Sequence, residues 1–189
     1  MKRISSRNVK RLLIAFLLLW MSPEIHAQET SIKKNALLIS PFGLLAGKYN
    51  KIRIRYEHLA SNNFAYGVDF KYYFPKEYPG FQILPFMKYF FIDDSEGPYF
   101  YMTGVYGQNQ HLPPERTKYT SCYGVGAGVG LQYFMGMEKN GMFDISIGMK
   151  YVITDAKFGA RNPSSNYDDY FFIGPGAIID GILAVGFRF

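Results

Sequence analysis

Hydrophobic and polar positions alternate along most of the chain after about residue 34, in segments of roughly ten residues. The clearest segment is 64–74 (FAYGVDFKYYF), in which every second residue from Phe64 to Phe74 is apolar or aromatic. The intervening positions are small, polar or charged and include Asp69 and Lys71. A period of two places successive side chains on opposite faces of a β-strand. The segment therefore predicts a strand with one apolar face and one largely polar face.

The same alternation predicts about eight strands in total. Pro41 and Gly43 interrupt the first of them, which leaves its facing open, and the fifth has a weaker pattern. Pro85 lacks a backbone donor, so we expect a local bulge in the fourth strand. The predicted strands cover residues 35–46, 50–60, 64–74, 81–91, 99–107, 119–134, 142–155 and 177–189.

The connections between these strands alternate in length. Those at 61–63, 93–98 and 136–141 are short, whereas those at 75–80, 108–118 and 156–176 lengthen toward the C-terminus. The first connection, at 47–49, is short and breaks this trend. Short turns at one end and long loops at the other are typical of outer-membrane β-barrels.

The distribution of charge favours a membrane barrel over a soluble one. One face of the strands is nearly free of charge, and in water such an exterior would be an aggregation hazard. A soluble barrel such as a lipocalin has its apolar face inside. We therefore expect an all-β, closed, antiparallel up-and-down transmembrane barrel over residues 35–189, with a lumen filled by side chains. The charged residues expected inside, as a structural ion-pair network, are Arg53, Arg55, Glu57, Asp69, Lys71, Lys88, Asp144, Lys150, Asp180 and Arg188.

The first 27 residues have the pattern of a secretory signal peptide. Five basic residues precede an apolar run at 12–21, which is too short for a transmembrane helix. We expect cleavage after Ala27 rather than an uncleaved anchor, and a periplasmic segment at 28–34. Removing residues 1–27 takes away five of 21 Lys and Arg and one of 15 Asp and Glu, which leaves 16 basic and 14 acidic residues. The basic balance of the whole chain therefore does not indicate nucleic-acid binding.

The C-terminus adds a second targeting signal. Phe189 is preceded at alternate positions by Phe187 and Val185, which resembles the signal by which outer-membrane barrels are recognised for assembly. From about residue 35 to Phe189 the chain resembles small outer-membrane barrels of the OmpX/OmpA transmembrane-domain type. The resemblance rests on pattern, without a motif of fixed residues. It implies an outer-membrane location, contact with lipid and lipopolysaccharide, and contact with the barrel-assembly machinery during biogenesis.

We interpret the protein as a non-enzymatic barrel with a structural role or a surface-interaction role through its extracellular loops. The alternative is an outer-leaflet enzyme that modifies lipid A acyl chains, for which His111 would be the base, with Glu115 and Ser121 nearby in sequence. The other histidine of the barrel region, His58, lies near the end of the second strand. We expect His111 to be a solvated loop residue, and we expect no cofactor. The pattern leaves the oligomeric state open.

Three further features have structural interpretations. Asp168 and Asp169, in an aromatic-rich loop, could bind a cation, but we expect a polar loop at the membrane interface and no metal. The glycines from Gly124 to Gly130 alternate within a strand, so they are not a dinucleotide fingerprint; they make room for bulky partners across the lumen. Cys122 is the only cysteine, which excludes an intramolecular disulfide, and we expect no catalytic role for it.

Overall fold

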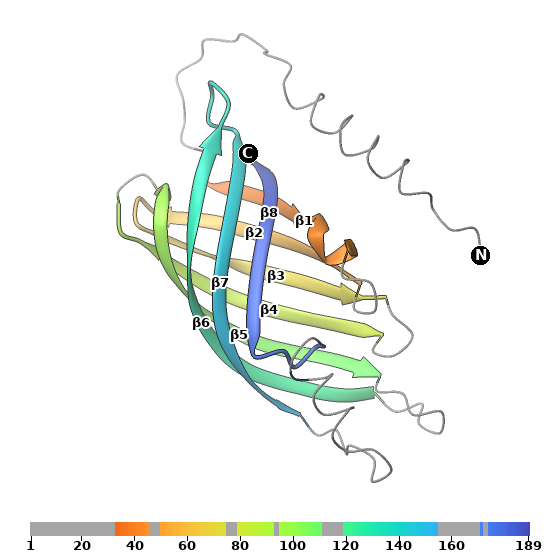
Figure 1. Ribbon diagram of the computed structural model, residues 1–189. Coiled ribbons are helices and arrows are strands. Elements are labelled where there is room, and N and C mark those ends of the chain that lie inside the picture. The colour runs from red at the N-terminus through yellow and green to blue at the C-terminus, as the bar shows by residue number, and fades with distance from the viewer. Residues whose placement is uncertain are drawn as a thin grey trace, which may run out of the picture. The chain divides into compact units, whose positions relative to one another are not determined.

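The computed structural model describes residues 33–45, 50–74, 79–92, 95–110, 119–154, 171 and 174–189. They form a closed antiparallel barrel of eight strands, in which each strand pairs with its neighbours in sequence and β1 pairs with β8 (Figure 1). The expected fold class is confirmed. The strands are β1 (Asn35–Ser40), β2 (Lys51–Ser61), β3 (Phe64–Tyr73), β4 (Gly80–Phe90), β5 (Gly97–Gln110), β6 (Tyr119–Met135), β7 (Gly141–Thr154) and β8 (Ile179–Arg188).

β1 and β5 differ most in length from the expectation. β1 ends at Ser40 rather than at residue 46, and a short 3-10 helix, η1 (Pro41–Leu45), follows it. Pro41 cannot donate to a ladder, and Gly43 lies so close to β2 that a Cβ there would be 2.3 Å from the carbonyl oxygen of Lys51. β5 is longer than expected because it pairs with β6 along its whole length.

The bulge expected at Pro85 is absent. The β4–β5 register is the same on both sides of the proline, where Ile83 pairs with Tyr106 and Phe86 with Thr103. No residue is inserted, and the Thr103 hydroxyl donates to the Pro85 carbonyl at 3.0 Å. The prediction was wrong because a missing donor interrupts a ladder without requiring an extra residue.

The connections define two different ends of the barrel. The turn end holds the start of β1, the end of β8 and the connections at 62–63, 91–96 and 136–140. The loop end holds the connections at 41–50, 74–79, 111–118 and 155–178. The first connection is therefore longer than expected, because β1 ends at Ser40 and η1 lies within the connection. Within the described residues, no helix has the length and apolar character needed to cross a membrane.

Glycines on the inner face of β6 make room for two tyrosine rings. Gly130 pairs with Tyr99 and Gly128 with Tyr101 on the adjacent strand β5. A Cβ at Gly130 would lie 2.4 Å from the Tyr99 ring. The bulky partners are therefore neighbours on the next strand and do not reach across the lumen as expected. Both tyrosines belong to one buried apolar cluster with Phe90, and two further clusters contain Leu38 and Leu84.

Candidate functional site in the charged interior

All ten charged residues expected inside the barrel are buried. Ion pairs join eight of them into one connected set that spans β2, β3, β4, β7 and β8. Lys150 lies near this set, and Arg188 lies apart from it at the turn end. Together with Lys51 and Lys150, these eight residues form two groups that differ in their balance of positive and negative charge.

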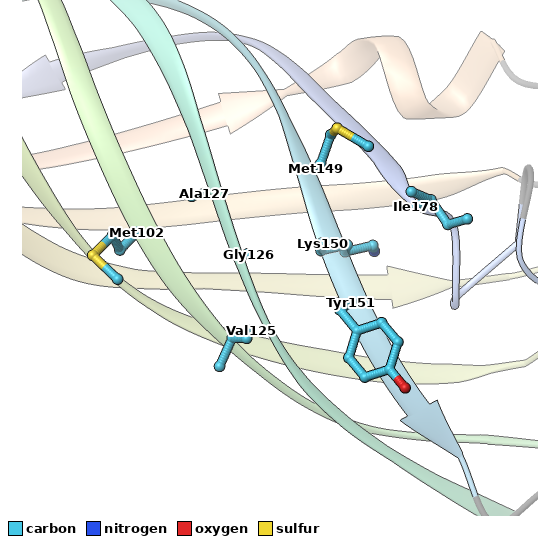
Figure 2. A pocket seen from close by; sticks show the side chains of 8 residues that line it. All are labelled: Met102, Val125, Gly126, Ala127, Met149, Lys150, Tyr151 and Ile178. Carbon is cyan, nitrogen blue, oxygen red and sulfur yellow. The ribbon is translucent and has the colours of Figure 1, made fainter.

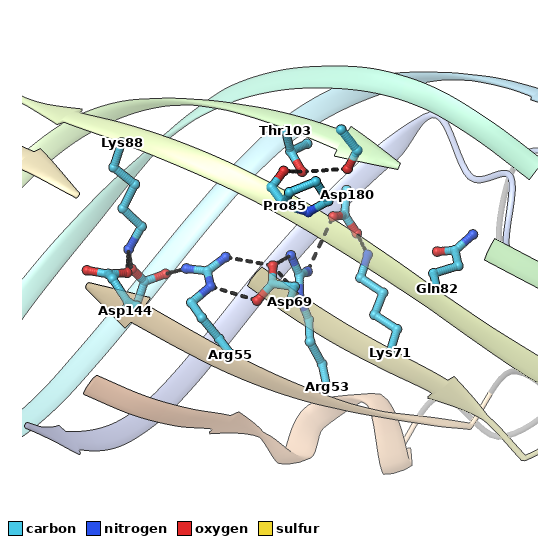
Figure 3. Close-up of polar contacts among 12 residues, drawn as sticks. Arg53, Arg55, Asp69, Lys71, Gln82, Pro85, Lys88, Thr103, Asp144 and Asp180 are labelled. Atoms are coloured by element: carbon cyan, nitrogen blue, oxygen red, sulfur yellow. Dashed lines mark hydrogen bonds and ion pairs between the residues drawn. The ribbon is translucent and has the colours of Figure 1, made fainter. Parts of the chain in front are cut away.

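The turn-side network consists of Arg55, Glu57, Asp69, Lys88 and Asp144. Arg55 donates to both oxygens of Asp69, from Nε to Oδ1 at 2.7 Å and from Nη2 to Oδ2 at 3.0 Å. Its Nη1 donates to Asp144 Oδ1 at 3.1 Å. One guanidinium group thus joins β2 to β3 and, across the interior, to β7 (Figure 3). Two parallel hydrogen bonds to one carboxylate fix both the position and the orientation of the arginine.

Lys88 completes this network on β4. Its Nζ lies 2.6 Å from Asp144 Oδ2 and donates to Gln132 Oε1 at 2.7 Å. It also lies 2.6 Å from Glu57 Oε2, an ion pair without hydrogen-bond geometry, since neither Glu57 oxygen has a hydrogen-bond partner among the residues described. The Tyr99 hydroxyl donates to Asp144 at 2.9 Å, and its ring centre lies 4.4 Å from Lys88 Nζ. Every charge in the turn-side network therefore contacts an opposite charge.

The loop-side cluster consists of Lys51, Arg53, Lys71, Lys150 and Asp180. Lys71 Nζ lies 2.7 Å from Asp180 Oδ1, and Arg53 Nη1 lies 3.3 Å from Asp180 Oδ2. Arg53 also pairs with Asp69 through Nε, at 3.0 Å, and through Nη2, so it connects the cluster to the turn-side network (Figure 3). Within the described ranges, neither Lys51 nor Lys150 has a carboxylate at ion-pair distance.

A short segment of the last connection closes part of the loop end. Residues 174–177 are buried, although they belong to a loop. The carbonyl oxygen of Pro175 accepts from Gln82 Nε2 at 2.7 Å and from Lys150 Nζ at 3.3 Å. The segment is therefore anchored to β4 and β7, and its backbone fills space beside the loop-side cluster.

Arg188 has a separate role at the turn end. Its Nε and Nη2 donate to the carbonyl oxygen of Lys33 at 3.0 and 2.6 Å, and its guanidinium lies 4.2 Å from the ring centre of Phe134. These contacts hold the residues that precede β1 against β8. The residues expected to form the assembly signal face outward at the end of the barrel. They are Val185, Phe187 and Phe189, of which Phe187 and Phe189 are exposed.

Several interior residues were missed at the sequence level. Lys51 lies two positions before Arg53 on the same face, so the alternation contained the signal for it. Tyr99 and Gln132 also follow the alternation, but neither is charged, so neither was included in the predicted network. The role of the Pro175 carbonyl could not be predicted from the sequence. Every residue has a backbone carbonyl, and only the three-dimensional course of the loop decides which side chains it accepts hydrogen bonds from.

The other candidate residues do not form a described site. His111, Glu115, Asp168, Asp169 and the expected signal peptide lie outside the described residues. Ser121 is at the loop end, where its backbone carbonyl accepts from Thr154 Oγ1 at 3.3 Å. His58 is at the turn end, with Nδ1 2.8 Å from Asn35 Oδ1. Cys122 is buried, with Gln82 Nε2 3.5 Å from its Sγ. In the part of the chain that the structure describes, no three His, Cys, Asp or Glu side chains are grouped to hold a metal ion.

The outer face of the barrel is apolar and ordered by residue type. Aliphatic residues and methionines occupy the middle of the strands, among them Ile147, which is 61% exposed. Aromatic residues occur toward both ends. Outward aromatic residues near the turn end include Tyr66, Tyr89, Phe100, Tyr133, Phe143 and Phe187, and those near the loop end include Tyr72, Phe81, Tyr106, Tyr123 and Tyr151. Tyr56 and Phe70 are also outward and lie nearer the middle of β2 and β3.

Comparisons with protein-family models, with curated proteins and with solved structures find no match for this chain. The function is therefore inferred from the arrangement of the protein's own residues.

Proposed function

We propose that this protein is an integral outer-membrane β-barrel with a lumen filled by side chains, and that its loop end has a structural or surface-interaction role. The observation that carries the proposal is the inversion of the two faces. Ion pairs and polar groups lie inside the barrel, whereas the outside is an aliphatic band between two aromatic belts. Aromatic rings favour the membrane–water interface, and closure of the barrel pairs every strand edge, as a bilayer requires.

The spacing of the aromatic belts agrees with the thickness of a membrane. Phe143 and Tyr151 are eight residues apart on β7, and Tyr123 and Tyr133 are ten residues apart on β6. At about 3.3 Å per residue these separations are about 26 and 33 Å along the strands. A strand tilt of about 40° reduces them to about 20 and 25 Å, close to the apolar band of known outer-membrane barrels.

The outer surface also has a hollow that suits lipid chains. Figure 2 shows it over β5, β6 and β7, next to the residues that precede β8. Its outward side chains include Met102, Val125 and Met149, and Gly126 and Ala127 form its floor. Small residues between flexible methionine side chains leave a mainly apolar groove that acyl chains can fill, with Lys150 and Tyr151 also in its lining.

The orientation follows from the two ends. Outer-membrane barrels have short periplasmic turns and longer extracellular loops. We therefore assign the turn end, with both ends of the barrel sequence, to the periplasm and the loop end to the cell surface. The loop end is where a partner outside the cell would bind. The ion pairs inside hold the strands together, and this suits a stable scaffold for those loops.

Cell fractionation tests the proposal. The full chain is expressed in a Gram-negative host, the envelope is separated by density, and the outer-membrane fraction is analysed on detergent gels with and without boiling. We expect the protein in the outer membrane, shortened at its N-terminus, with faster migration before boiling because the folded barrel stays closed. Recovery from the soluble periplasmic fraction would refute the proposal.

A further inference from the structure

Among the described residues, the loop-side cluster holds four basic side chains, Lys51, Arg53, Lys71 and Lys150, and one carboxylate, that of Asp180. Even when Arg53 is assigned wholly to Asp69, three lysines remain for one described carboxylate, that of Asp180, and only Lys71 lies at ion-pair distance from it. Lys71 and Lys150 are 0% and 5% exposed, so water screens their charges little. Buried charges are stable only when opposite charges or hydrogen-bond acceptors surround them.

The polar partners of two of these lysines are incomplete. Within the residues described, Lys150 Nζ has one acceptor, the Pro175 carbonyl at 3.3 Å. Lys51 is half-buried and lies over the Tyr73 ring, with Nζ 5.7 Å from its centre. An ammonium group has three donors, and a single long hydrogen bond or an aromatic face leaves most of them unused.

A buried amide at the same end is also unsatisfied. Asn109 is 1% exposed, and neither its Nδ2 nor its Oδ1 has a hydrogen-bond partner in the described part of the chain. Backbone pairing places it in one row across the sheet with Lys51, Tyr73 and Gly80, on the inner face of β5. Buried amides in folded proteins nearly always have partners, so this unpaired amide at the loop end is a candidate contact for a ligand.

We propose that the loop-side cluster binds a phosphate group, with Lys51 and Lys150 as its main cationic contacts and the Asn109 amide as a further donor. The three lysines together favour a compact anion with several acceptor oxygens, which a phosphate supplies and a single carboxylate does not. Binding there would neutralise the excess charge that Asp180 leaves. Two sources share this chemistry: a phosphate ion free in solution and the phosphate of a lipid headgroup at the cell surface.

The turn-side network provides a comparison within the same barrel, because its buried charges are paired. There, three carboxylates face Arg55, Lys88 and the shared Arg53, and the ammonium group of Lys88 contacts two carboxylates and an amide oxygen. Among the described residues, the charges of the turn-side network are therefore all paired, whereas the loop-side cluster contains two lysines, the half-buried Lys51 and the buried Lys150, that have no ion pair.

The test is a titration with inorganic phosphate. Protein expressed from the full chain is purified in a neutral detergent, and its unfolding midpoint is followed by circular dichroism at constant ionic strength, with a bulky organic anion as the balancing salt. A specific site stabilises the folded state in a saturable way. We expect Lys51→Met and Lys150→Met, made separately, to weaken the apparent phosphate affinity by roughly tenfold or more, the effect of one lost hydrogen bond to a charged group.

Two further variants sharpen the result. Asp180→Asn removes the competing carboxylate and is expected to tighten phosphate binding. Lys139→Met removes an exposed lysine at the turn end and is the matched control, with unchanged affinity. In phosphate-free buffer, both interior lysine variants are expected to be at least as stable as the parent protein, because each removes an unbalanced charge.

A second arm of the experiment distinguishes the two sources of the phosphate, the free ion and the lipid headgroup. In this arm phosphatidic acid is added in phosphatidylcholine vesicles. Competition between this lipid and free phosphate would assign the site to a headgroup, and its absence would assign it to a soluble ion. A response of the parent protein that does not saturate, or that is the same in both interior lysine variants, would overturn the inference. It rests on the proposed function only for the lipid source, since a soluble barrel would still bind phosphate in the first arm.

Discussion

The two halves of the barrel interior use the same residue types in opposite ways. In the turn-side network each carboxylate contacts at least one cation, and Asp144 also accepts from the Tyr99 hydroxyl. In the loop-side cluster one carboxylate, that of Asp180, is shared among several cations, and Lys150 relies on a backbone carbonyl. We expect the turn-side network to contribute to the fold alone, whereas the loop-side cluster is where we propose that phosphate binds. Substitutions at the two ends should therefore have different effects on stability.

The largest effect is expected from Asp69→Asn. Asp69 accepts from both Arg55 and Arg53, so its loss leaves two buried guanidinium groups without their central carboxylate. We expect a loss of about 3–5 kcal/mol in the free energy of unfolding, measured by denaturant titration in detergent or vesicles. Glu138→Gln, on the exposed turn between β6 and β7, is the control and should change stability little. A comparable loss in both variants would contradict the structural role of the network.

The next effect is expected from Gly130→Ala. The added methyl group would lie 2.4 Å from the Tyr99 ring and 2.7 Å from the Ile145 carbonyl oxygen, so the ring that supports Asp144 must move. We expect a loss of about 2–3 kcal/mol, the cost of overpacking. Gly181→Ala is matched to it, because the nearest atom to a Cβ there is 3.7 Å away. Equal tolerance of the two substitutions would show that Tyr99 is not packed as described.

A smaller effect is expected from Tyr99→Phe. It removes the hydroxyl that donates to Asp144 and leaves the ring in place. Since Asp144 keeps Arg55 and Lys88, we expect a loss of about 1–2 kcal/mol. Tyr133→Phe, on the outer face of β6, should be close to neutral in the same unfolding measurement. If Tyr133→Phe were the more damaging of the two, the polar role of Tyr99 would be rejected.

The smallest effect is expected in the loop-side cluster. Lys150→Met removes one of the cations of the loop-side cluster and replaces it with an uncharged side chain of similar length. In phosphate-free buffer we expect a change within about 1 kcal/mol or a gain in stability, because isolated buried charges destabilise a fold. A loss as large as that of Asp69→Asn, in the same denaturant titration, would mean that the two halves of the interior do not differ.

The alternation of residues predicted most of this architecture, because a period of two assigns each side chain to a face without knowledge of its partners. It placed Arg55 and Asp144 inside, but it could not pair them, since a contact between β2 and β7 depends on barrel closure and register. Prolines were harder to interpret. Pro41 ends β1, whereas Pro85 stays within a regular β4, and only the neighbouring strands distinguish the two cases. The contacts of the Pro175 carbonyl depend on the course of a loop, which the alternation of hydrophobic and polar residues does not predict.

The outer surface provides the most direct test of the central claim that the barrel spans a membrane. The chain has one tryptophan, Trp20, so a Trp20→Phe background makes any introduced tryptophan the only one. Ile147→Trp places it at the middle of the outer face, and Met137→Trp places it in the exposed turn between β6 and β7. In vesicles of lipids brominated deep in their acyl chains, the fluorescence of the Ile147→Trp variant should be quenched strongly and that of the Met137→Trp variant little. Equal, weak quenching of both variants would contradict a barrel that spans the membrane.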